Sequence, residues 1–111
     1  MQLLVVVLHR EELLDDVLSL LVELELPDAV VVDSRSGLEL LERDLPIFAG
    51  LRSLVPAGID FCRLVLCLVH DDAIGGEAVA AVRELGGHIR HVDGEAPNTV
   101  LLLPVLTAAR F

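Results

Sequence analysis

Two segments of this chain would form strands with apolar side chains on both faces. Residues 3–8 contain no polar side chain, and residues 61–69 contain only Arg63. Successive side chains of a strand point to opposite faces of the sheet, so a strand with one face in water alternates apolar and polar residues. These segments do not alternate, which predicts central strands covered on both faces. The two helices that the sequence predicts can cover one face, and another copy of the chain is the simplest cover for the other.

The composition limits the classes of function. The 111 residues form one domain, residues 1–111, and the net charge of -10 argues against nucleic-acid binding, which needs a basic patch. All eight cationic residues are arginines, which excludes Schiff-base and P-loop chemistry that depends on lysine. The apolar stretches fall short of the ~20 residues of a membrane-spanning helix, so no membrane insertion is expected. Cys62 and Cys67 lie five residues apart on one predicted strand, so their side chains face opposite ways and a disulfide between them is not expected. Together with the lack of a recognisable signal peptide, this predicts a reduced, cytoplasmic protein.

The spacing of apolar residues predicts an α+β domain with the order β-α-β-β-α-β. Strands are expected at residues 2–8, 29–33, 61–69 and 99–103, and helices at residues 11–26 and 73–85. Pro27 is expected to stop the first helix, and Gly86-Gly87 the second. This order is the ferredoxin-like arrangement, a four-stranded antiparallel sheet with both helices on one face. The two doubly apolar strands then lie in the centre, where we expect them to run parallel to each other.

The connection between the second and third strands, residues 34–60, is much longer than a hairpin turn of ~2–5 residues. Residues 39–43 are compatible with a helical turn or two. Residues 45–55 are too apolar for a disordered linker. This part either packs at a subunit boundary, or docks on a partner protein or closes over a ligand. The residues expected to contact a partner are Ile47, Phe48, Leu51 and Arg52.

Arginine side chains are the main candidates for ligand binding. Arg35, Ser36 and Gly37 follow the second strand, and an arginine beside a flexible glycine suits a phosphate or carboxylate through charge-assisted hydrogen bonds. The alternative for these residues is a solvated turn. Arg63 lies on a buried strand and therefore needs a carboxylate partner, within the chain or across a subunit boundary.

Metal binding and catalysis have weaker support. His88 and His91 lie three residues apart beside Asp93 and Glu95, a set that zinc or copper accepts, but no fourth ligand is defined and a surface loop is the favoured explanation. The carboxylate pairs lie at helix starts or exposed positions, where capping or solvation explains them. No Ser-His-acid set can be placed from spacing, so we expect no enzyme.

Four short motifs follow one another at spacings that resemble a known family. They are Glu12–Val17 in the first helix, Val30–Gly37 leading into the long connection, Leu68–Asp72 before the second helix, and Leu103–Val105 near the end. In this order they resemble the nitrogen-regulatory PII signal-transduction proteins, and more closely their divergent PII-like relatives, over nearly the whole chain.

This resemblance implies a compact homotrimer whose sheets face the threefold centre, with small-ligand sites in the clefts between subunits. Residues 34–60 would correspond to the family's T-loop, which reports the ligand state to a partner such as a transporter or an enzyme. The typical ligands are adenine nucleotides, ATP or ADP. Of the family's Gly-Asp-Gly nucleotide loop, Asp93-Gly94 survives. The ligand-binding residues implied here are Arg35, Ser36, Gly37, Arg90, Gly94 and Arg110.

The leading hypothesis is therefore a cytoplasmic PII-like homotrimer that senses a small anionic ligand and signals through residues 34–60. Two alternatives remain open. One is a metal-binding trimer that resembles the divalent-cation-tolerance proteins and uses His88 and His91. The other is a structural interaction module with no ligand.

Overall fold

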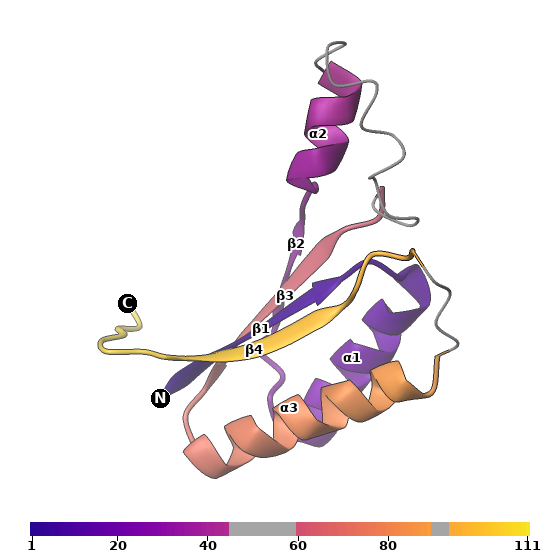
Figure 1. The fold of residues 1–111 in the computed structure, drawn as a ribbon. Coiled ribbons are helices and arrows are strands. Elements are labelled where there is room, and N and C mark those ends of the chain that lie inside the picture. Colours follow the sequence, from indigo (N-terminus) through magenta and orange to yellow (C-terminus); the bar gives the residue numbers. More distant parts are fainter. Residues whose placement is uncertain (45–59, 90–93) are drawn as a thin grey trace.

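The computed structural model describes residues 1–44, 60–89 and 94–111, which form one sheet and three helices (Figure 1). The elements are β1 (Gln2–Leu8), α1 (Glu11–Glu23), β2 (Val30–Asp33), α2 (Gly37–Asp44), β3 (Arg63–Val69), α3 (Asp72–Gly87) and β4 (Thr99–Pro104). This is the predicted order, with α2 added in the long connection. The rest of that connection, including the partner-contact residues Ile47, Phe48, Leu51 and Arg52, lies outside the described residues.

The four strands form one antiparallel sheet in the order β2-β3-β1-β4. The two doubly apolar strands occupy the centre, as predicted. The expectation that they run parallel was wrong, because β1 pairs antiparallel with β3, with Gln2 opposite Val69 and Leu8 opposite Arg63. The parallel relations lie between β1 and β2 and between β3 and β4, and each of these pairs is separated by one inserted strand.

One face of the sheet packs against α1 and α3 and forms the core. Figure 1 shows both helices on this side, as predicted. Every second residue of the central strands faces the helices. The buried residues of this layer are Leu4, Val6 and Leu8 from β1, Val65, Cys67 and Val69 from β3, Leu13, Val17 and Leu21 from α1, and Ala78 and Val82 from α3.

The first helix ends earlier than Pro27 predicts. Glu25 adopts a positive φ of 61°, the Leu26 N–H donates to the Leu21 carbonyl at 2.8 Å, and the Glu25 N–H donates to the Val22 carbonyl at 3.0 Å. These are the two hydrogen bonds of a Schellman motif, which satisfies the last carbonyls of a helix. Leu26 is then buried against the core, so packing of this residue accompanies the end of the helix.

The second long helix differs from its prediction at its C-terminal end. The side chain of Asp71 caps its start, accepting a hydrogen bond from the Ala73 N–H at 2.9 Å, which confirms the predicted cap. At the other end, α3 ends at Gly87, two residues after the predicted end at residue 85, so the glycine pair that was expected to stop the helix forms its last two residues. Neither glycine uses the positive φ that a helix-ending glycine usually adopts.

Gly75 allows α3 to approach the sheet closely. A Cβ atom at this position would run into the side-chain oxygen of Gln2 and would lie 3.0 Å from Leu102 Cδ2. At Gly76, the next residue, the corresponding position is open space. Both glycines lower the intrinsic stability of the helix, but only Gly75 has a packing reason to be a glycine.

These two positions give a paired test of the packing. Gly76→Ala should raise the free energy of unfolding by about 0.5–1 kcal/mol, because alanine loses less backbone entropy than glycine in a helix. Gly75→Ala should give a clearly smaller gain or a loss, because its methyl group displaces Gln2 and Leu102. Urea unfolding followed by circular dichroism measures both. Equal stabilisation by the two substitutions would contradict the close approach.

Candidate functional site

The face of the sheet that turns away from α1 and α3 is apolar across all four strands. The register places Leu3, Val5 and Val7 of β1 opposite β3 and β4 residues that share this face. We call this surface the open face; its residues are Leu3, Val5, Val7, Val30, Val32, Leu64, Leu66, Leu68, Thr99, Leu101 and Leu103. All of them are half-buried or exposed, and no charged residue is among them.

The open face is large for a surface that meets water. Four strands spaced ~4.8 Å apart and about 20 Å long project an area of roughly 400 Å². Monomeric proteins rarely expose contiguous apolar patches above a few hundred Å². The central strands therefore have apolar residues on both faces, and the described residues of one copy cover only one of those faces.

The predicted ligand residues Arg35, Ser36 and Gly37 lie where β2 leads into α2. The Ser36 carbonyl accepts the N–H of Leu40 at 3.1 Å, so this segment starts a helix rather than a free turn. Arg35 Nη2 lies 3.9 Å from Glu39 Oε1 on the same helix. The Arg35 side chain is 48% exposed, whereas Glu39 is buried, so the guanidinium remains available at the surface.

Gly94 lies at the same end of the sheet as Arg35 but beside the opposite edge strand. Its φ of 85° is in the left-handed region that favours glycine, and residues 94–98 lead into β4. Two central strands separate β2 from β4, a distance of roughly 14 Å between the edge strands. One copy of the chain therefore does not bring Arg35 and Gly94 together.

Another predicted ligand residue, Arg110, lies away from Arg35 in one copy. Arg110 Nη2 lies 3.5 Å from Asp28 Oδ2, and Asp28 precedes β2, at the end of this strand opposite to Arg35. Both side chains are exposed. Arg90 lies outside the described residues.

Arg63 has the carboxylate partner that its position on a central strand predicted. Its Nε lies 2.8 Å from Asp33 Oδ1 on the neighbouring strand β2. Its Nη1 donates to the Cys62 carbonyl at 2.9 Å, and its guanidinium lies 4.7 Å from the centroid of the Phe61 ring. These contacts hold the start of β3 beside the end of β2. The long connection leaves β2 and returns to β3 at this place.

A set of polar contacts that sequence reasoning missed joins the ends of β1 and β3 to the start of β4. The His9 N–H donates to Asn98 Oδ1 at 2.8 Å, and His9 Nδ1 lies 2.9 Å from the Phe61 carbonyl, which assigns the proton to that ring nitrogen. The sequence signal was the polar pair His9-Arg10 directly after an apolar strand, which we interpreted only as the end of that strand.

Arg10 extends this set of contacts to the first helix and to the residues before β4. Its Nη2 lies 2.7 Å from Glu12 Oε1 and its Nη1 lies 3.2 Å from Glu95 Oε2. A backbone hydrogen bond at the start of α1, together with Arg10, holds the pKa of the Glu12 carboxyl below its usual value. The start of α1 and the segment before β4 are thus held together by one guanidinium.

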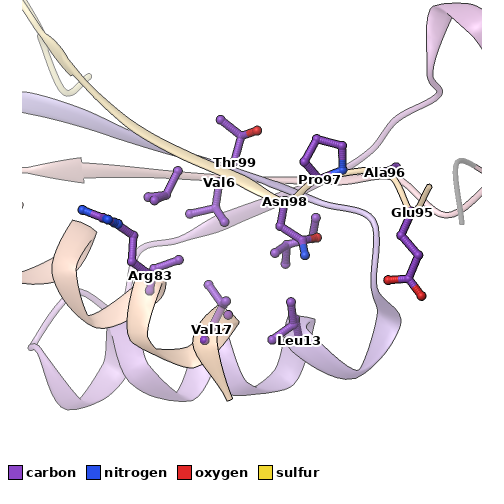
Figure 2. Close-up of a pocket in the computed structure, with 14 residues that line it drawn as sticks. Val6, Leu13, Val17, Arg83, Glu95, Ala96, Pro97, Asn98 and Thr99 are labelled. Atoms are coloured by element: carbon purple, nitrogen blue, oxygen red, sulfur yellow. The ribbon is translucent and has the colours of Figure 1, made fainter. Parts of the chain in front are cut away.

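A cavity of about 370 Å³ lies directly below these contacts, between β1, α1, the C-terminal half of α3 and residues 95–100. Its floor is apolar and includes Val6, Leu13 and Val17, and Figure 2 shows Arg83 and Glu95 at its two ends. The polar side chains that line it are Arg83, Glu95 and Asn98, and Thr99 borders it although its side chain belongs to the open face. The sequence did not predict this cavity, because its walls come from four separate parts of the chain.

The two cysteines are free and buried, as expected for core residues. Ser34 Oγ lies 3.1 Å from Cys62 Sγ. Burial, and to a lesser extent the negative charge of Asp28, raises the pKa of the Cys67 thiol. The described residues contain no group of three histidine, cysteine, aspartate or glutamate side chains that could hold a metal ion, and His91 lies outside them.

Comparison with known proteins adds no assignment. No protein-family model matches the chain, and no curated protein is significantly similar to it. Within the described part of the chain, every helix is too short or too polar to cross a membrane. The function therefore has to be argued from the fold, the open face and the groups around the sheet end.

The contact between His9 and Asn98 can be tested by substitution. Asn98→Ala should lower the free energy of unfolding by about 1–3 kcal/mol, because it leaves the half-buried His9 N–H without its acceptor. Asn98→Asp keeps an oxygen at the same place and should retain most of the stability. Urea unfolding of the two variants measures the difference. If both lose the same stability, the hydrogen bond is not the reason for the loss.

Proposed function

We propose that this chain is a cytoplasmic PII-like regulatory protein, active as a homotrimer and not as an enzyme. It binds a small anionic ligand between its subunits and passes the ligand state to a partner protein, such as a transporter or an enzyme, through residues 34–60. The observation that carries this proposal is the open face, because a sheet with apolar residues on both sides needs a cover that one copy does not supply. The ferredoxin-like strand order and the four motifs that resemble the PII-like proteins support the same conclusion.

Assembly through the open face is favoured by its chemistry. Removal of apolar surface from water contributes about 25 cal/mol per Å². A standard interface buries roughly 800 Å² on each partner, so the ~400 Å² projected by the sheet supplies about half of one. Val31 of β2 lies outside the open face and supplies further surface, since it is exposed in a single copy.

Assembly also explains why the predicted ligand residues are divided between the two edges of the sheet. Arg35 follows β2 and Gly94 precedes β4, and both lie at the same end of the sheet. In a ring of copies, the β2 edge of one subunit lies beside the β4 edge of the next, which brings the two groups into one cleft. The exposed guanidinium of Arg35 then supplies positive charge for a phosphate or carboxylate in a chain of net charge -10.

The long connection is placed to report on such a cleft. Its described part, α2, starts two residues after Arg35 and projects away from the sheet in Figure 1. An anion that binds Arg35 competes with Glu39 for the same guanidinium, since the two side chains lie 3.9 Å apart. Ligand binding at this position therefore changes the first turn of α2, and through it the connection that leads to the partner.

The assembly is tested by light scattering after size-exclusion chromatography. The wild type should have three times the mass of one chain. Leu101→Glu should yield single copies, because it places a charge on the open face at a side chain that one copy leaves 37% exposed. The matched control is Val22→Glu on α1, where the side chain is 62% exposed on the other side of the molecule, and it should remain trimeric. A wild type of single-chain mass would overturn the proposal.

The anion site is tested with ATP, ADP and inorganic phosphate as probes. At least one of them should raise the melting temperature of the wild type, and Arg35→Gln should reduce its affinity about tenfold or more, because a charge-assisted bond is lost. Isothermal titration calorimetry measures the affinity, with Arg35→Lys, which keeps the positive charge, as the matched control. Equal binding to wild type and Arg35→Gln would remove Arg35 from the site.

A further inference from the structure

We propose that residues 105–111, which we call the arm, pack against the open face of a neighbouring copy. The arm binds at one end of that face, on Leu3, Leu68 and Leu103, which we call the leucine row. The occupant of this part of the open face is therefore a second copy of the same chain. The inference rests on the assembly proposed above, and it names the segment that completes the contact between copies.

The arm has a defined position, although its apolar side chains are not covered within one copy. The Val105 N–H donates to the Met1 carbonyl at 3.1 Å, which continues the pairing of β4 with β1 by one residue. Further along, Arg110 Nη2 lies 3.5 Å from Asp28 Oδ2. Between these two contacts the side chain of Leu106 is 98% exposed, and Figure 1 shows the arm beyond the start of β1. The arm is thus held by its own copy and presents its apolar side chains outward.

The composition of the arm is typical of a segment that is covered by protein. Residues 96–109 contain no charged side chain, whereas 23% of the whole chain is charged. A segment that stays in water is usually polar and charged, because it has no apolar surface to bury. The arm instead exposes Leu106 and Phe111. Its chemistry therefore matches the open face, which also consists of apolar side chains without a charge.

The leucine row lies at the same end of the sheet as the arm. Leu3 is opposite Leu68 in β3 and opposite Leu103 in β4, so the three side chains cross three neighbouring strands. Leu68 is 37% exposed and Leu103 is 45% exposed. The arm begins two residues after Leu103 and leaves the sheet beside the row. These exposures show that the arm of a copy does not cover the leucine row of that same copy.

Rotational symmetry allows the arm of one copy to reach the leucine row of the next. In a closed ring of identical copies, each atom keeps its height along the rotation axis. Because the arm and the leucine row lie at one end of the sheet, they are at similar heights in all copies. The open face alone projects ~400 Å², and a standard interface buries roughly 800 Å² on each partner. The arm supplies apolar surface toward this difference.

A spin label on the arm tests the contact between copies directly. Thr107→Cys is labelled with a nitroxide, which keeps Leu106 in place, and Cys62 and Cys67 are buried and do not compete for the label. These copies are mixed in urea and refolded with wild-type copies that carry isotope-labelled leucine methyl groups. The methyl signals of the leucine row should broaden in the wild-type copies. The matched control is a label at Val22→Cys on the exposed side of α1, which should leave these signals sharp.

Substitution of Leu106 tests whether the contact stabilises the assembly. Leu106→Asp should raise the concentration at which copies separate about tenfold or more, because burial of a leucine side chain is lost. Leu106→Met keeps an apolar side chain of similar size and should separate at the wild-type concentration. Light scattering on dilution measures both variants. An equal separation concentration for Leu106→Asp and the wild type would contradict the arm contact.

The two tests also distinguish the arm from the trimer. A wild type of three-chain mass whose leucine-row signals stay sharp overturns the arm contact and leaves the trimer in place. Broadened signals in a wild type of two-chain mass support the arm contact and overturn the trimer. A wild type of single-chain mass overturns both.

Discussion

The antiparallel pairing of β1 with β3 is the constraint on which the rest of the structure depends. In this pair, residues opposite each other share a face, so Leu4 with Cys67 and Val6 with Val65 form one apolar surface while Val5 with Leu66 forms another. Both helices pack on the first surface because each has one apolar stripe to bury. The second surface is then fixed as apolar by the same two strands. The apolar character of the second face therefore arises from the same strands that form the core, and no separate motif is needed to create it.

The end of the sheet at which β1 finishes is where the structural features meet. His9, Arg10, Asn98 and Glu95 join β1, α1 and the segment before β4 at this end. Residues 95–100 line the cavity within one copy, and Gly94 directly precedes them.

The sequence predicted most of the fold and little of the site. The order of strands and helices could be predicted from the apolar runs and from apolar residues at helical spacing. These patterns show whether a residue lies in the sheet or in a helix. The relative direction of β1 and β3 was predicted wrongly, although an antiparallel sheet with these two strands side by side already requires them to run antiparallel. The end of α1 was misplaced because the Schellman hydrogen bonds at Glu25 and Leu26 outweigh the signal of the following Pro27.

The site could be predicted only as far as local chemistry allowed. Arg63 needed a carboxylate, and the structure supplies Asp33, because a charge on a central strand must be compensated wherever it lies. The cavity and the contacts of Arg10 could not be predicted, since they join residues about 85 positions apart. Gly86 and Gly87 were interpreted as a helix stop, and α3 does end at Gly87, although neither glycine adopts the positive φ that usually accompanies this role.

The exposed edge strand β2 has a consequence for the aggregation of the protein in a cell. All four residues from Val30 to Asp33 are exposed, and three of them are valines on a strand with one unpaired side. Strands of other chains can pair with such an edge, which leads to aggregation. The charge of Asp33 at the end of β2 reduces this pairing only in part. Under the proposed assembly, a newly made copy passes through an aggregation-prone interval that ends when its neighbours close over the edge. The rate of that assembly relative to the rate of synthesis would then set the yield of the folded protein.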